Sequence, residues 1–292
     1  MERVKKVIKY IIGLLNPQLL AKINFKKSVG WNLDFNNVRD FNEKIQWLKF
    51  YSDTSQWELW ADKYRVRDYV SKCGLSSMLV NLYAVFDNSK DFSIDDLPNS
   101  FIIKSNNGCG GNFVVKDKSR LDMVQLRSLL KGWSRERFGV LTAEPHYLKI
   151  PFKIIVEELL ENEFSFSNSM VDFKVYCFNG EPEYICVCYD RDCITKKSKM
   201  SLFDKDWVCC NKYLINRSGA IDDIERPKSL DKMKEACRKL SKGIPMVRID
   251  FYEYKGNPYF GEMTMTNAGG YDTDYTLEFR RLLGDLIILP KK

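Results

Sequence analysis

The chain has 292 residues, which is enough for two domains or for one large α/β unit. Hydrophobic residues make up 45% of it, as expected for a globular protein with a sizeable core. The net charge of +7 suits nucleotides, other polyanionic substrates or an anionic membrane surface. The lysines and arginines are spread along the chain, which argues against a nucleic-acid-binding arm.

The rarer residue types exclude several kinds of chemistry. The nine cysteines fit no zinc-ribbon spacing, and without a secretory signal their free thiols predict a reducing cytoplasm. The single histidine, His146, has no recognisable site around it and is predicted to be a loop or surface residue. Chemistry in this protein would therefore use carboxylates, lysines, arginines and a bound cofactor.

Residues 1–23 are predicted to form an amphipathic helix, too short and too charged to span a membrane. Its basic residues lie away from an apolar side that comprises Val4, Val7, Ile8, Ile11, Ile12 and Leu15. Two interpretations remain open. The helix packs against the body or a partner subunit, or it rests on anionic lipid as a peripheral contact at the inner face of the membrane.

Residues 40–70 are predicted to be helical, with Trp47, Trp57 and Trp60 as core anchors. A helix that begins at Asp62 is expected to end near Gly74, because glycine is a common C-cap. A strand over 79–86, a helix over 121–137 and a loop over 139–148 are predicted next.

A glycine-rich hairpin lies between that strand and that helix. An apolar run ends at Lys104, and a turn with Gly108, Gly110 and Gly111 leads into a second run. Lysine supplies a point charge, and glycines let backbone N–H groups approach a phosphate closely. The spacing is neither that of a Walker A loop nor that of a Rossmann turn. The hairpin is interpreted as a phosphate-covering tip, with an ordinary surface turn as the alternative.

The second half of the chain reads mainly as strands. They are predicted over 154–160, 172–178 and 184–189, followed by a helix over 230–242 and a hairpin of strands 246–252 and 259–264. Strand alternation places Arg248, Asp250 and Tyr252 on one face, and Glu262 and Thr264 on one face of the next strand.

Charged residues on apolar strands are costly to bury unless they are paired or bound to metal. Two carboxylates on neighbouring strands suit Mg²⁺ that bridges nucleotide phosphates, and the adjacent Arg248 could stabilise charge on a transferred group. The alternative is an ordinary Arg–Asp pair across a solvated face.

The order of these motifs resembles the ATP-grasp superfamily, and in particular its TupA-like branch, which is associated with teichuronopeptide-type and other surface-polysaccharide biosynthesis. The resemblance runs from about residue 38 to the C-terminus. It rests on five motifs: Phe41 to Leu48, Ala61 to Tyr64, Asn106 to Asn112, Asp172 to Lys174 with Phe178 to Gly180, and Tyr259 to Glu262.

The resemblance implies an α+β fold in which two subdomains grip ATP. The expected organisation is a helical N-terminal region (1–60), a subdomain with the glycine-rich hairpin (61–157) and a C-terminal subdomain with the metal and catalytic strands (158–292). It also implies that ATP phosphorylates a carboxylate and that an amine attacks the acyl phosphate.

The resemblance further implies roles for individual residues. Those expected to bind ATP are Lys63, Lys104 and Lys174 at the phosphates, Gly108, Gly110 and Gly111 in a mobile lid, and Glu157, Glu158 and Leu160 in the hinge that binds adenine. Glu157 or Glu163 would hold the ribose, and Asp172 would orient Lys174. Arg248 would stabilise the acyl transition state, and Asp250 and Glu262 would hold Mg²⁺.

One position departs from the superfamily's usual Glu-x-Asn pattern, because Thr264 stands where asparagine is expected. Either Thr264, with water, or Asn267 would complete the metal site. The region before Asp62 is also short for this superfamily, so the acceptor would be held by the C-terminal part and loop 138–150, or by a partner.

The expected activity is an amide ligase that joins an amine or amino acid to the carboxylate of a uronic acid sugar. Two alternatives stay open. One is a kinase on the same fold that phosphorylates a sugar or lipid-linked hydroxyl. The other is a glycosyltransferase or its nucleotide-binding partner, for which Asp190-Arg191-Asp192 has the metal-motif spacing but reads as loop charge.

Overall fold

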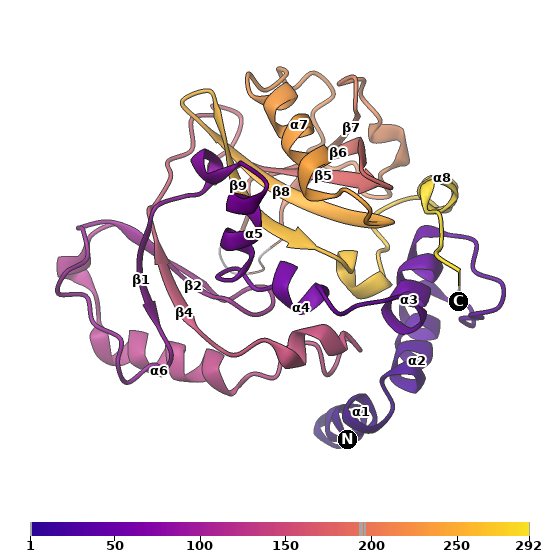
Figure 1. Cartoon of the computed structure of the whole chain (residues 1–292), viewed down its shortest axis with the longest axis horizontal. Helices are drawn as coiled ribbons and strands as arrows, with labels where there is room; N and C mark the ends of the chain where they lie inside the picture. The colour runs from indigo at the N-terminus through magenta and orange to yellow at the C-terminus, as the bar shows by residue number, and fades with distance from the viewer. Residues whose placement is uncertain (1, 193–194, 196, 292) are drawn as a thin grey trace.

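Two antiparallel sheets dominate the computed structural model, which describes residues 2–192, 195 and 197–291 (Figure 1). The first sheet has the order β1-β4-β2-β3, with β1 (Leu82–Phe86), β2 (Phe101–Ser105), β3 (Asn112–Val115) and β4 (Ile154–Glu157). The second has the order β7-β6-β5-β8-β9, with β5 (Asp172–Phe178), β6 (Glu181–Tyr189), β7 (Lys199–Asp204), β8 (Met246–Tyr254) and β9 (Asn257–Thr264). The predicted α+β class is confirmed.

The helices lie around these sheets. They are α1 (Glu2–Leu15), α2 (Pro17–Val29), α3 (Phe41–Tyr51), α4 (Trp57–Trp60), α5 (Val66–Lys72), α6 (Met123–Arg135), α7 (Leu230–Leu240) and α8 (Leu277–Leu286). Short 3₁₀ segments are η1 (Ser76–Met78), η2 (Lys118–Arg120), η3 (Pro145–Lys149), η4 (Asn211–Tyr213) and η5 (Asn267–Gly270). In Figure 1, α6 runs along the outer side of the first sheet and α7 lies against the second.

Each sheet has its own apolar core. In the first, Leu126 and Leu130 of α6 are buried with alternate strand residues such as Ile103 and Val156. In the second, alternate residues of β5 and β8 join Met233, Ala236 and Cys237 of α7, and these strand residues are Phe173, Val175, Cys177, Val247, Ile249 and Phe251. Because strand side chains alternate, the intervening polar residues lie on the opposite face.

Several elements differ from those predicted. The helix expected over 1–23 is two helices, because Asn16 caps α2 through a bond from the backbone N–H of Leu19 to its Oδ1, and Pro17 opens the new helix. The helical region 40–70 divides into α3, α4 and α5. Strand β7 and helix α8 were not predicted.

His146 is also not a surface residue. It lies in η3, is 4% exposed and packs edge-on against Trp57. Burial lowers the pKa of His146 to about 3, and Lys49 and Lys149 add to this effect, so the ring is neutral at physiological pH. Trp47 and Trp57 are buried core residues, as predicted. The proposed domain boundaries stay a prediction.

Candidate active site

The polar face of the second sheet gathers charged residues from three adjacent strands. Lys174 of β5 lies opposite Asp250 of β8, and Asp250 lies opposite Glu262 of β9. Arg248 lies between Tyr176 and Thr264. Residues directly opposite in a sheet project to the same face, so the two sets expected on one face each form a single cluster.

Asp250 is the centre of this cluster. It is 3% exposed, and Lys174 Nζ donates to its Oδ2 over 2.5 Å. Arg248 donates from Nε to Oδ1 at 2.7 Å and from an Nη atom to Oδ2 at 2.8 Å. The two cations therefore offset the free-energy cost of burying the Asp250 carboxylate.

Lys174 is held between two carboxylates. Its Nζ lies 2.5 Å from Asp250 and 3.6 Å from Asp172, whose other partner is Arg191 at 2.8 Å. Burial opposes the ammonium charge, but Asp172 and Asp250 outweigh it and raise the pKa of Lys174 above its ordinary value. Lys174 is therefore a fixed positive charge at neutral pH. Asp172 lies beside Lys174, and its orienting role stays a prediction.

Glu262 of β9 links the second sheet to Lys63, which contacts the hairpin of the first sheet. Its Oε2 lies 3.0 Å from Lys63 Nζ, and its Oε1 accepts from Arg248 over 3.2 Å. Burial raises the pKa of Glu262, but Lys63 and Arg248 outweigh it and hold the pKa well below its usual range. The side chain is 29% exposed, so water screens these pairs, but the carboxylate is ionised at neutral pH.

Lys63 also contacts the tip of the glycine-rich hairpin. Its Nζ donates to the carbonyl oxygen of Gly108 at 2.6 Å, and its backbone N–H donates to that of Asn106 at 3.0 Å. Asn106 is fully buried, and its side-chain amide bonds Asp62 and the backbone of Pro151 and Lys153. Lys63 therefore bridges the predicted lid and the predicted metal strand.

Lys104 lies at the end of β2 beside the hinge. Its Nζ is 2.8 Å from Glu157 Oε2, and Arg67 Nη1 is 2.9 Å from Glu157 Oε1. Arg67 was not among the predicted site residues, although it lies four residues after Lys63 in the sequence. The Glu157 side chain thus serves two cations. Glu158 bonds Asn81 at 2.7 Å.

The rest of the predicted hinge region has other contacts. Leu160 is buried, and Glu163 accepts from the backbone N–H of Lys255 at 2.6 Å. None of these contacts tests which group holds adenine or ribose, so those assignments stay predictions.

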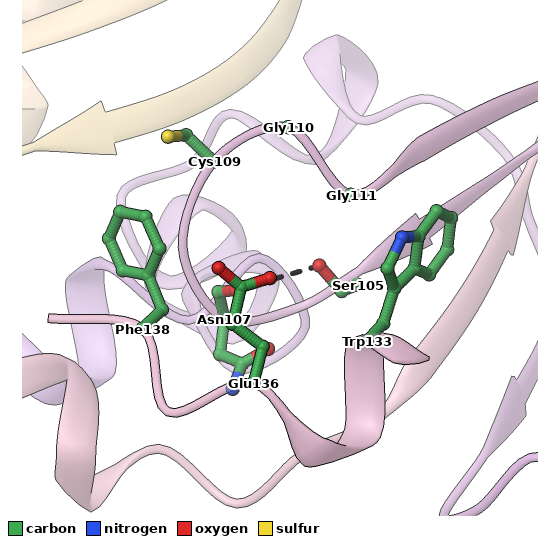
Figure 2. Close-up of a pocket in the computed structure, with 8 residues that line it drawn as sticks. All are labelled: Ser105, Asn107, Cys109, Gly110, Gly111, Trp133, Glu136 and Phe138. Carbon is green, nitrogen blue, oxygen red and sulfur yellow. Dashed lines mark hydrogen bonds between the residues drawn. The ribbon is translucent and has the colours of Figure 1, made fainter. Parts of the chain in front are cut away.

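A cavity of about 190 Å³ lies between the hairpin tip and the end of α6 (Figure 2). Its lining residues are Ser105, Asn107, Cys109, Gly110, Gly111, Trp133, Glu136 and Phe138. Gly108 and Gly110 have φ of +84° and +83°, a region that favours glycine. The lining of the cavity does not include Asp250 or Glu262, so the cavity is space beside the tip and is not the charged cluster.

The segment after β9 completes the cluster and is held by α3. Asn267 accepts from Arg248 through Oδ1 at 2.6 Å and donates to Asp272 at 2.6 Å. From α3, Gln46 donates to the carbonyls of Gly269 and Gly270, and Lys49 to that of Gly269. The contacts of Asn42 and Asp272 are reciprocal, which ties the two segments together. Asn42 and Gln46 belong to the motif from Phe41 to Leu48 on which the family resemblance rests, but no role was predicted for this motif.

These residues fit a magnesium nucleotide. Mg²⁺ is usually held by one or two carboxylates plus substrate phosphates, and Asp250 and Glu262 lie on paired strands. Within the described residues, no group of three or more His, Cys, Asp or Glu side chains could hold a metal without the substrate. Thr264 Oγ1 lies 3.3 Å from Glu262 Oε1, and both candidates accept from Arg248, Thr264 Oγ1 at 3.1 Å and Asn267 Oδ1 at 2.6 Å. Which of them completes the site stays a prediction.

Several solved structures are similar to this chain at low sequence identity. Among them are D-alanine–D-alanine ligase from Bacillus anthracis complexed with ATP (14% identity, TM-score 0.45, 85% of this chain and 66% of that one) and D-alanine–D-alanine ligase from Helicobacter pylori (15%, 0.46, 87% and 68%). A third is the ATP-grasp ligase PsnB complexed with a minimal precursor (11%, 0.43, 82% and 59%). The chain thus spans about two thirds of the length of these proteins or less.

Comparison of sequences gives the family. No curated protein matches the chain. The model of the family described as TupA-like ATPgrasp matches residues 43–288, which is most of the chain and includes every charged residue of the cluster. ATP-grasp enzymes typically use ATP and Mg²⁺. The chain belongs to the TupA-like ATP-grasp family.

Proposed function

We propose that this ATP-grasp enzyme is an ATP-dependent carboxylate–amine ligase that works through an acyl phosphate. The observation that carries the proposal is the cluster of Lys174, Arg248, Asp250 and Glu262 on one sheet face, with Lys63 reaching it from beside the glycine-rich hairpin. A fixed array of cations around two carboxylates suits a substrate that is a metal-bound triphosphate.

The residues divide the work by position. Lys63, Lys104 and Lys174 bind phosphate oxygens, and the backbone of Gly108 to Gly111 covers them. Asp250 and Glu262 would hold Mg²⁺, which would supply positive charge to neutralise the phosphates. Arg248 joins Asp250 and Glu262 to Asn267, and it is proposed to face the acceptor and to stabilise negative charge that develops on it.

The proposed reaction has two steps. An oxygen of the substrate carboxylate attacks the γ-phosphorus of ATP, the bond to the bridging oxygen breaks, and ADP leaves. A neutral amine then attacks the carbonyl carbon, the carbon–oxygen bond to phosphate breaks, and the nitrogen loses a proton. The products are an amide, ADP and phosphate. Arg248 is proposed to stabilise the tetrahedral oxyanion that forms in the second step.

The proposed substrates are a sugar carboxylate, such as a uronic acid, and an amino acid or other amine. The product would belong to a capsule, an O-antigen or another surface polysaccharide. Support for this part comes from the association of the TupA-like branch with surface-polysaccharide biosynthesis. The loop from Thr266 to Asp274 is proposed to border the acceptor, because it follows the metal strand directly and carries the Asn267 contact to Arg248.

The test is to incubate the pure protein with ATP, Mg²⁺, uronosyl acceptors and a panel of amines. We expect ADP release that needs both substrates and a product whose mass equals acceptor plus amine minus water. Release of ADP that never requires an amine would contradict the proposal.

Hydroxylamine distinguishes the ligase from a kinase on the same fold. Only an acyl phosphate reacts with it to give a hydroxamate, so a phosphorylated product without hydroxamate would favour a sugar or lipid-linked hydroxyl kinase. Preference for UDP-sugars over ATP would favour the glycosyltransferase alternative. The structure gives that alternative little support, because Asp190 pairs with Lys199 and Arg191 with Asp172.

A further inference from the structure

Helix α1 presents its apolar side to solvent. Its residues at the spacing of one helix face are strongly exposed: Val4 61%, Val7 53%, Ile8 51%, Ile11 49% and Leu15 81%. On α2, which begins at Pro17 and folds back beside α1, Leu19 (46%) and Ile23 (38%) are exposed as well. We call these seven residues the apolar stripe.

The opposite side of α1 is the one that contacts the body. Lys9 donates to Asn24 of α2 at 2.8 Å. Gly13 packs closely against the body, because a Cβ there would lie 2.3 Å from the carbonyl oxygen of Val140. Lys9 and Gly13 are one turn apart and lie across the helix from Ile11. A helix that served only to fill the core would bury its apolar side against the body and expose its polar side. In Figure 1, α1 stands at the edge of the molecule, away from both sheets.

The charge of the protein is concentrated on the same two helices. Residues 1–29 contain seven lysines and arginines and one acid, whereas the remaining residues contain 39 basic and 38 acidic residues. Nearly all of the net charge of +7 therefore belongs to α1 and α2. The exposed cations on these helices are Arg3, Lys5, Lys6, Lys22, Lys26 and Lys27.

We propose that α1 and α2 dock this enzyme on an anionic lipid surface, with the apolar stripe in the boundary between headgroups and acyl chains and the cations against lipid phosphates. An exposed apolar stripe flanked by lysines and arginines is the pattern of an interfacial helix. A second copy of the chain fits less well, because pairing this surface with itself would bring two sets of like charges together.

This mode of docking lies on the membrane and does not cross it. Within the described residues, no helix is both long and apolar enough to span a bilayer. The inference does not depend on which reaction the site catalyses, and the stripe lies outside the matched family region of residues 43–288.

The test is co-sedimentation of the full chain with vesicles of phosphatidylcholine alone or with about one third phosphatidylglycerol. We expect at least about tenfold stronger binding to the anionic vesicles, weakened by salt. Equal binding to both vesicles, or binding to neither, would overturn the proposal.

Two variants and one matched control separate the contributions. Ile8→Ser/Ile11→Ser should weaken binding to anionic vesicles by more than about tenfold, because two apolar side chains no longer enter the lipid. Lys5→Gln/Lys6→Gln should lower it by about tenfold. Val124→Ser/Val208→Ser removes two exposed apolar residues elsewhere (81% and 59%) and should leave it unchanged.

Thermal unfolding checks that all three variants fold, and sedimentation equilibrium measures self-association. An equal loss of binding in the control pair would overturn lipid docking in favour of non-specific adhesion. If the protein does not bind vesicles but self-associates, and Ile8→Ser/Ile11→Ser abolishes the self-association, the surface is a dimer interface instead.

Discussion

The two sheets contribute to the candidate site in different ways. In the cluster on β5, β8 and β9, each carboxylate is fixed by cations: Asp250 by Lys174 and Arg248, and Glu262 by Lys63 and Arg248. At the β2–β3 hairpin, the tip is glycine-rich, and the Lys63 contact to Gly108 joins it to the charged cluster. One region is preorganised, and the other is predicted to be a mobile lid.

This difference predicts that changes in the two regions affect different steps, turnover in one and ATP binding in the other. Charges held in a low-dielectric face need little reorganisation when a transition state forms, so removing one should affect turnover. The glycine-rich tip is proposed to cover the phosphates of ATP, so altering it should chiefly affect binding of ATP. The predictions below test this division, from the largest expected effect to the smallest.

Changes in the metal strands should have the largest effect. Glu262→Gln and Asp250→Asn should each lower the rate of ADP release by about 10³-fold or more, because each removes a proposed metal ligand and unbalances the adjacent cations. Asp250 is buried, so its variant is also expected to be less stable, by about 3–5 kcal/mol. Glu262 is partly exposed, so its variant should remain folded.

Asp231→Asn is the matched control, since Asp231 pairs with Arg226 on the surface of α7 and is 73% exposed. It should change neither rate nor unfolding temperature by much. Full activity in both Asp250→Asn and Glu262→Gln would remove the metal assignment.

Lys104→Ala should weaken ATP binding by about tenfold and change the maximal rate less, because Lys104 acts from the end of β2, outside the charged cluster. Glu157 keeps Arg67 as a partner at 2.9 Å, so the fold should persist. Kinetics over a range of ATP concentrations separate the two effects. Lys199→Ala, at an exposed lysine that pairs with Asp190, is the control. A large loss of maximal rate with unchanged KM for ATP would assign Lys104 to the chemical step.

The sequence predicts the strands of the site better than the contacts between them. Alternation placed Arg248 with Asp250 and Glu262 with Thr264, because the strand period is local. It could not show that Asn267 binds Arg248, or that Gln46 and Lys49 hold the following loop, since these contacts join residues up to about 220 positions apart. A lone histidine likewise carries no periodicity that reveals burial, which is why His146 was misplaced.

Two unpredicted elements have different causes. Strand β7 is an edge strand whose register depends on β6, so its short pattern is weak by itself. Helix α8 had a readable signal, because Thr276 caps it and Phe279 and Leu283 recur at helical spacing. Only the first omission is a limit of single-sequence reasoning.

Gly111→Ala should test the hairpin with a moderate effect. An added Cβ would lie 2.1 Å from Ser105 Oγ, so β2 and β3 must separate slightly at the tip. Strain of this kind costs about 1–3 kcal/mol, and we expect ATP binding to weaken about fivefold or more by calorimetry.

The matched control for the hairpin is Gly132→Ala on α6, where an added Cβ meets nothing within 4 Å. It should leave ATP binding unchanged and stabilise the helix by up to about 1 kcal/mol. The Ser105→Ala background should partly restore binding to Gly111→Ala, since it removes the hydroxyl that the new methyl group meets. No rescue would mean that the glycine acts through its backbone.

The smallest effect is expected from Lys49, which supports the preorganised face from α3. Burial lowers the pKa of Lys49 from 10.5 to about 7, although Glu144 partly offsets this. Between these values the unfolded chain binds more protons at this lysine than the folded chain, so this group makes stability rise with pH from about 7 to about 10.5. Lys49→Met should abolish that rise.

Urea unfolding of the wild type and Lys49→Met at a series of pH values measures the difference in unfolding free energy, which should grow with pH across this window. Gln46→Ala removes another bond to Gly269 without removing a titrating group, so its difference from wild type should stay constant. A difference for Lys49→Met that is flat or falls with pH would show that the buried lysine stays charged when folded. The charged face would then be supported by a further fixed cation, not by a neutral amine.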